Sequence, residues 1–299
     1  MGYEATMRMD FLEPEDQLWR GIQFEVVDEE ELARQQAAGG DRVHRHDGVW
    51  WRELKFGFYQ PCFSYAQVDH RVACPHRFRA MTGFMHVAAP GSPSNLNFRT
   101  LVREKIPEYC LQGLGKWRRR TVRKVLARLE VRPVEHLEDL LGPGYEIYVS
   151  WHTRVRWGAD KTRRSDYKAW ITRVFHSPRQ MVLGAYNKGN LVAFMLPKAV
   201  RHVVTPSFVA SHTEALSDSP NDALYHAFLS IARQTPGVTM AGFGPLSKKE
   251  SLDTFKLAYC QIREEPGYVW LNPILNVFAG DRLRNRYPWI ATMMRNTRS

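Results

Sequence analysis

A lysine and a histidine–glutamate pair in the second half of the chain have side chains suited to acid–base chemistry. Lys256 can polarise a carbonyl or bind a phosphate, and His212 or Glu214 can accept a proton from an amine. Because side chains alternate along a strand, His212 and Glu214 are predicted to lie on one face near the end of a strand. The alternative is that Lys256 is a solvated helix residue and that the pair is ordinary surface at a strand end.

A second feature suited to chemistry is a predicted helix start at residues 219–222. Ser219 can cap the helix, Pro220 fits its first position, and Asp222 follows three residues after the cap. The free N–H groups of a helix start attract anions, so Ser219, Asn221 and Asp222 are candidates for binding an anionic donor.

The segment from Gln180 to Pro273 must position these groups. Two apolar runs, 180–186 and 191–197, flank Asn187-Lys188-Gly189-Asn190, which is typical of a hairpin turn. Ser247 and Glu250 have the spacing of a capping box at the start of a later helix. The full predicted order is hairpin, strand 202–211, helix 217–234, strand 238–244, helix 247–261 and strand 267–273.

This order resembles the second half of an acyltransferase of the GNAT superfamily, and it is closer to the Fem-type branch. The resemblance is carried by SPNDALYHAFL at the helix start, GFG after the following strand, and Ser251-Leu252-Asp253-Thr254-Phe255-Lys256. Upstream, the run from Leu114 to Lys124 is similar to the arginine-rich helix of that branch. The resemblance covers roughly residues 113 to 273.

The resemblance implies an α/β fold: a GNAT-like mixed sheet flanked by helices, in two tandem units. Residues 1–112 would form a reduced first unit and residues 113–299 the acyltransferase unit. The implied function is transfer of an acyl or aminoacyl group from an activated donor to an amine. The alternative is a non-catalytic GNAT-like protein that binds an anionic polymer, RNA or glycan, through basic surfaces.

Two departures from ordinary GNAT enzymes bear on the donor. The pyrophosphate loop of those enzymes is glycine-rich, whereas this chain has LSDSPND, and Phe255 stands where they usually carry a tyrosine. Fem-type proteins share both departures and take an aminoacyl-RNA donor. The resemblance therefore leaves acyl-CoA and aminoacyl-tRNA open as co-substrate, with no permanently bound cofactor and with tRNA as a candidate partner.

The acceptor is expected to meet basic and aromatic side chains. Residues 116–129 predict a helix with one apolar face and one basic face, which is typical either of a solvated surface or of a polyanion platform. A second basic and aromatic stretch precedes the hairpin, where most aromatic residues would simply pack. The candidate acceptor-binding residues are Arg119, Arg123, Trp157, Arg163, Arg164 and Tyr167.

Composition narrows the class of protein. The formal net charge of +11 favours an anionic partner, and the absence of a long apolar run or a secretory leader predicts a cytoplasmic protein without a membrane span. Cys62, His70, Cys74 and His76 lie close in sequence but match no usual paired-ligand spacing, so no metal site is predicted. Residues 10–40 predict a helix, and residues 49–89 predict a small sheet.

Overall fold

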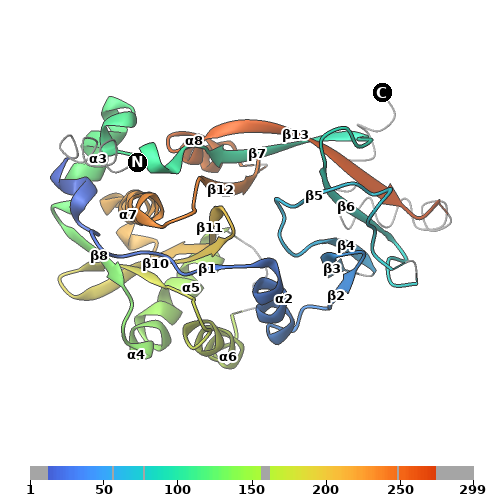
Figure 1. Ribbon diagram of the computed structural model, residues 1–299. Coiled ribbons are helices and arrows are strands. Elements are labelled where there is room, and N and C mark those ends of the chain that lie inside the picture. The colour runs from blue at the N-terminus through green and yellow to red at the C-terminus, as the bar shows by residue number, and fades with distance from the viewer. Residues whose placement is uncertain (1–12, 56, 77, 156–161, 248, 274–299) are drawn as a thin grey trace. The chain divides into compact units, whose positions relative to one another are not determined.

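Figure 1 shows a computed structural model that describes residues 13–55, 57–76, 78–155, 162–247 and 249–273. The chain folds into two compact units. Unit 1 contains residues 13–27 and 101–261, and unit 2 contains residues 28–100 and 262–273. The tandem division between residues 112 and 113 stays a prediction.

Unit 1 is built on a mixed sheet with the strand order β7-β12-β11-β10-β9-β8, and β1 pairs in parallel with β10. Its strands are β1 (Val26–Val27), β7 (Leu96–Arg103, from residue 101), β8 (Leu129–Pro133), β9 (Leu183–Asn187), β10 (Asn190–Val200), β11 (Val203–Ser211) and β12 (Met240–Pro245). The predicted hairpin is confirmed as β9–β10, with Lys188 and Gly189 at positive φ in the turn.

Helices cover both faces of this sheet (Figure 1). Alternation along the strands divides the side chains between two cores: Ala193 and Met195 pack with α7 and α3, whereas Phe194 and Leu196 pack with α4, α5 and α6. The helices are α3 (Lys116–Leu126), α4 (Leu137–Leu141), α5 (Pro143–Val155), α6 (Arg164–Phe175), α7 (Pro220–Gln234) and α8 (Glu250–Leu257). Short 3-10 helices are η2 (Pro14–Gln17), η3 (Ile106–Glu108), η4 (Leu111–Gly113) and η6 (Glu214–Asp218).

The parallel strands β11 and β12 part soon after they begin. Their paired positions are Val203 with Met240 and Val204 with Ala241. Strand β11 then continues to Ser211 beside β10, and β12 continues to Pro245, without further pairing between β11 and β12. Beyond the paired residues, the backbone groups that the two strands turn towards each other need other partners, and the Phe243 carbonyl finds one in Lys256.

The N-terminal segment of unit 1 is fastened to α7 and the sheet by buried bonds. The Trp19 indole N–H donates to the Val131 carbonyl at 2.7 Å, and the Phe24 N–H donates to the Thr235 hydroxyl at 3.0 Å. Trp19 also meets the His226 ring edge-on, with 5.5 Å between centroids. Residues 13–27 therefore belong to the core of unit 1, although they are distant from it in sequence.

Unit 2 contains the predicted small sheet, with the order β2-β3-β4-β6-β13 and with β5 also beside β6. Of the helix predicted over residues 10–40, only α2 (Glu29–Ala38) forms as an α-helix in the described residues; the Asp28 carboxylate caps its Glu31 N–H at 2.7 Å. The elements are α2 (Glu29–Ala38), β2 (Val43–His46), β3 (Val49–Lys55), β4 (Phe58–Pro61), β5 (Gln67–Val68), β6 (Gly83–Ala88) and β13 (Gln261–Leu271, from residue 262).

Several elements differ from the predictions; strand β13, for example, begins at Gln261 and not at residue 267. The basic helix ends at Leu126, because Leu129 already belongs to strand β8. Strand β7 was not predicted at all. Helix α8 begins at Glu250 without the expected Ser247 cap; instead the Asp253 carboxylate accepts the Ser247 N–H, with both oxygens at 3.0 Å.

Candidate functional site

Lys256 lies against strand β12 at a position where β12 has already parted from β11. Its ammonium donates to the Phe243 carbonyl at 2.8 Å, and Phe243 is two residues beyond the last paired position, Ala241. The side chain is half-buried, and burial lowers the pKa of Lys256, with Asp253 and Cys260 acting in the opposite sense. A partly desolvated ammonium interacts more strongly with nearby negative charge than a solvated one does.

A buried polar network lies at the start of α7. The Asp222 carboxylate accepts from the Arg118 guanidinium of α3 and, at 2.6 Å, from the Tyr259 hydroxyl that follows α8. The side chains of Arg118 and Asp222 are only 11% and 7% exposed, so the ion pair is largely shielded from water. Burial, followed by the Asp222 charge, raises the pKa of Tyr259 well above its usual value. We call Arg118, Asn221, Asp222, Lys256 and Tyr259 the α7-start site.

Arg118 also holds aromatic side chains in place. Its guanidinium carbon lies 4.7 Å from the ring centre of Trp117 and 5.0 Å from that of Phe255. Since Phe255 immediately precedes Lys256, the ion pair and the cation–π contacts together fix the helix that carries the lysine.

The start of α7 is confirmed at Pro220, with Ser219 as the N-cap residue. Ser219 has a φ of 56°, and within the described chain its side chain makes no capping hydrogen bond. Pro220 has no N–H, and the Asp222 N–H is already bonded to the Ser219 carbonyl at 3.0 Å. The side-chain oxygen of Asn221 is buried with no hydrogen-bond partner among the described residues. This helix start thus offers fewer free N–H groups to an anion than a glycine-rich loop does.

His212 and Glu214 lie close together, but not for the predicted reason. Strand β11 ends at Ser211, and Glu214 opens the 3-10 helix η6, so strand alternation does not reach them. The His212 ring nitrogen Nδ1 lies 3.9 Å from the Glu214 carboxylate, which is 91% exposed. They form a solvent-facing pair just past the end of β11.

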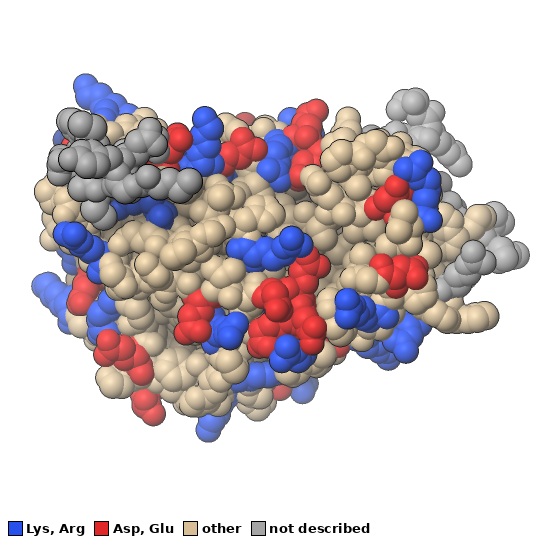
Figure 2. Space-filling model, viewed as in Figure 1, with Lys and Arg blue, Asp and Glu red and all other residues tan. Residues whose placement is uncertain are grey.

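The two arginines of α3 predicted to bind the acceptor are already engaged by the protein itself. Arg119 donates to the Gln112 side chain, and Arg123 pairs with Glu13 at 3.0 Å and with Glu15 at 3.3 Å. Lys116, Arg120 and Lys124 of α3 are also exposed, and so is Trp117 at 69%. On the face drawn in Figure 2, basic and acidic side chains are interspersed.

The remaining acceptor candidates are placed at α6. Arg163 is its exposed N-cap residue, and the Arg164 guanidinium carbon lies 5.1 Å from the Tyr145 ring centre. Tyr167 is buried, and its hydroxyl donates to the Leu140 carbonyl at 2.8 Å, so it packs in the core. Trp157 lies outside the described residues.

The described residues contain no group of three or more His, Cys, Asp or Glu side chains placed to hold a metal ion. Cys62 is buried, which raises the pKa of its thiol to about 12, and His70 stacks on Tyr268 with 3.6 Å between ring centres. His76 meets His46 edge-on at 5.3 Å. The prediction of no metal site stays a prediction.

Sequence reasoning did not single out Arg118 or Tyr259. One signal was available: Arg118 stands four and seven residues before Val122 and Val125, on the face of α3 that is buried. A charged residue on an apolar helical face predicts a buried partner. Nothing in the sequence identifies that partner as Asp222, which is 104 residues away.

No family model matches the chain, and no curated protein matches its sequence. Solved structures do match its fold. FemX is 11% identical with a TM-score of 0.60, and the alignment covers 88% of this chain and 97% of FemX. The C-terminal domain of a putative lysylphosphatidylglycerol synthetase from Agrobacterium fabrum is 12% identical with a TM-score of 0.55, covering 95% of this chain and 97% of that domain. L-PGS from Bacillus licheniformis is 13% identical with a TM-score of 0.50, covering 91% and 96%.

These similarities establish the fold and confirm the predicted fold class. The chain has a GNAT-like fold close to the Fem-type branch. None of the helices in the described part of the chain is both long enough and apolar enough to cross a membrane. The expected cytoplasmic location stays a prediction.

Proposed function

We propose that the protein is an N-acyltransferase of GNAT/Fem type that moves an acyl or aminoacyl group from an activated donor to an amine. The observation that carries this proposal is the position of Lys256: its half-buried ammonium, held on α8, contacts β12 where β12 and β11 have parted. A fold shared with FemX supports the same reaction class without establishing it.

In the proposed reaction, the amine nitrogen attacks the donor carbonyl and forms a C–N bond. Negative charge develops on the carbonyl oxygen, and the C–O bond to a ribose hydroxyl, or the C–S bond to a thiol, then breaks. The amine loses one proton and the leaving group gains one. The protein must therefore stabilise an oxyanion and accept and deliver protons.

We assign oxyanion stabilisation to Lys256. Its ammonium is fixed by one hydrogen bond to Phe243 and has further N–H groups to donate. Because burial lowers its pKa, the ammonium also releases a proton more readily than a solvated lysine does. His212 and Glu214, the solvent-facing pair at the end of β11, are the proposed acceptors of the amine proton.

The α7-start site favours an aminoacyl-tRNA donor over an acyl-CoA. Pro220 and the occupied Asp222 N–H leave little of the helix start for a pyrophosphate. The Asp222 carboxylate is held by Arg118 and Tyr259, so we propose that it positions α7 and does not touch the donor. Donor contact would then be left to Ser219 and Asn221, whose side-chain oxygen has no partner among the described residues.

The basic face of α3 supports an anionic partner, through residues other than those first expected. Lys116, Arg120 and Lys124 are exposed, whereas Arg119 and Arg123 are held by Gln112 and by two glutamates. Such a face suits the phosphates of a tRNA. The same face supports the second candidate function, a non-catalytic protein that binds an anionic polymer.

A ligand screen by thermal unfolding separates donors. A ligand that binds only the folded state raises the melting temperature, and the rise grows with its concentration. We expect an aminoacyl-tRNA or its minimal analogue to raise the melting temperature more than acyl-CoAs do. A shift equally large with deacylated tRNA, with no transfer to any amine, would favour the non-catalytic candidate.

A further inference from the structure

Unit 2 carries an exposed apolar loop between β5 and β6. Phe78 is 86% exposed, Val72 75% and Met81 60%, and Phe78 and Val72 are the two most exposed of the large apolar side chains described. Single exposed apolar residues are common on proteins, whereas these three fall within ten residues of one loop.

Backbone hydrogen bonds fix the shape of this loop, and in that shape its large apolar side chains point outward. The N–H groups of Arg79 and Ala80 donate to the His76 carbonyl at 2.8 and 3.0 Å. Ala80 is buried in the core around Trp51, between the two exposed side chains Phe78 and Met81. In this turn the small Ala80 side chain points inward, whereas the large apolar side chains of Phe78 and Met81 point outward.

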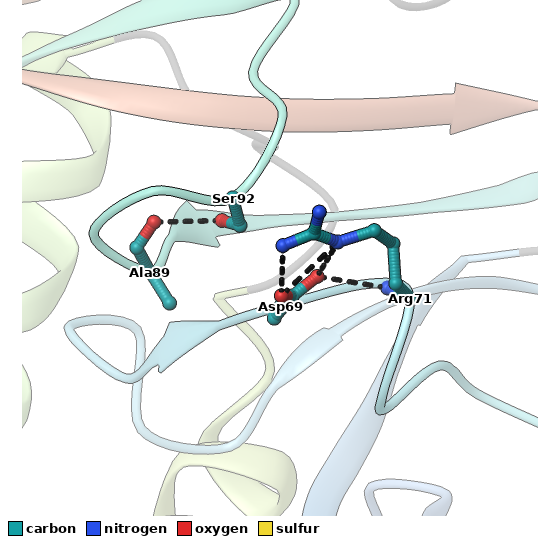
Figure 3. A network of polar contacts seen from close by, with 4 residues as sticks. All are labelled: Asp69, Arg71, Ala89 and Ser92. Atoms are coloured by element: carbon teal, nitrogen blue, oxygen red, sulfur yellow. Dashed lines mark hydrogen bonds and ion pairs between the residues drawn. The ribbon is translucent and has the colours of Figure 1, made fainter.

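Positive charge accompanies these apolar side chains. Arg71 is neutralised by the Asp69 carboxylate at 2.6 Å, as Figure 3 shows, so it adds little. Arg79 is exposed. Its charge also acts on His44, whose pKa is lowered to about 4 by burial first and by Arg79 second. In the sequence this exposed cation stands between Phe78 and Met81, so the segment with the exposed apolar side chains also carries a positive charge.

We propose that this tip, formed by the described residues 76 and 78–81, docks the protein on an anionic lipid surface. Phe78 and Met81 enter the boundary between headgroups and acyl chains, and Arg79 contacts lipid phosphates. This pairing of a few projecting apolar side chains with cations suits the membrane interface. It does not suit a stable protein interface, which buries about 800 Å² on each partner, whereas two side chains supply only on the order of 300 Å².

Co-sedimentation with vesicles tests the proposal. The full chain is mixed with vesicles of phosphatidylcholine alone or of phosphatidylcholine with phosphatidylglycerol. We expect binding to the anionic vesicles, weakened about tenfold by Phe78→Ser and similarly by Met81→Ser. Arg79→Glu should weaken binding to anionic vesicles and leave any residual binding to neutral ones unchanged. Leu18→Ser, at a 58%-exposed leucine of unit 1, is the matched control and should bind like the parent.

Depth of insertion provides a second readout. A Phe78→Trp variant should gain tryptophan emission that is quenched by brominated acyl chains when anionic vesicles are present. Equal binding of the parent, Phe78→Ser and Met81→Ser would overturn the proposal. The proposal would also be overturned if brominated acyl chains did not quench the tryptophan of Phe78→Trp. Loss of binding on addition of tRNA, with no effect of Phe78→Ser, would identify a polyanion surface instead.

Discussion

Replacing Arg118 with methionine isolates the charge in the buried network at the start of α7. Methionine retains the length that packs between Trp117 and Phe255 but removes the guanidinium. The Asp222 carboxylate would then keep only the Tyr259 hydroxyl as a hydrogen-bond donor.

The magnitude follows from how far the pair is removed from water. With side chains 11% and 7% exposed, loss of one partner leaves a nearly buried charge, which costs about 3–5 kcal/mol of unfolding free energy. The double variant Arg118→Met/Asp222→Asn leaves no buried charge, and the amide can still accept from Tyr259. We expect it to recover about 2 kcal/mol or more of that loss.

Urea unfolding, followed by tryptophan fluorescence, measures these differences. The matched control is Arg128→Met, because the Arg128–Asp218 pair has a longer separation of 3.5 Å and side chains 56% and 31% exposed. Its loss should cost less than about 1 kcal/mol. If Arg118→Met were as mild as Arg128→Met, or if the double variant were no more stable than Arg118→Met, the network would not hold α7 as described.

Two further predictions concern pH and polyanion binding. Burial lowers the pKa of His226 from 6.5 to about 4, so on acidification the unfolded chain takes up this proton before the folded chain does. The contribution of His226 to the free energy of unfolding is therefore full above pH 6.5 and falls by up to about 3 kcal/mol as the pH drops towards 4. His226→Gln should flatten this limb in urea unfolding measured across that range, and an unchanged slope would assign the loss to other groups. Lys116→Glu with Arg120→Glu should weaken tRNA binding and lessen its salt dependence in a filter-binding titration, because fewer counterions are released. Arg123→Glu breaks ion pairs with Glu13 and Glu15 and should instead lower the melting temperature; the reverse pattern would restore Arg123 as the ligand contact.

Local signals in the sequence predicted much of unit 1 because they act over a few residues. The turn at Lys188-Gly189 requires positive φ, and Pro220 fits only the first turn of a helix, so both positions were predicted correctly. The wrong prediction at Ser247 also concerns residues that are only a few positions apart. A capping box assigns the Ser247 N–H to the Glu250 carboxylate. In the structure the Asp253 carboxylate accepts this N–H instead.

Contacts between distant segments were not predictable in this way. Arg119 and Arg123 had the charge expected of a ligand surface, but the acids and amide that hold them come from residues 13–15 and 112. Tyr259 meets Asp222 where Tyr225 of α7 contacts Phe255 of α8 and Phe243 of β12, an arrangement that the order of elements does not reveal. Lys256 was identified from a resemblance, and the structure adds its burial and its contact with Phe243.

The most direct test of the proposed function is the transfer rate of Lys256→Met compared with that of Lys249→Met. Lys249 is the exposed N-cap residue of the same helix and has no proposed role. With an aminoacyl-tRNA donor and an amine acceptor, Lys256→Met should lower turnover on the order of a hundredfold, whereas Lys249→Met should leave it nearly unchanged. Equal turnover in the parent and both variants would contradict the assignment of the oxyanion to Lys256.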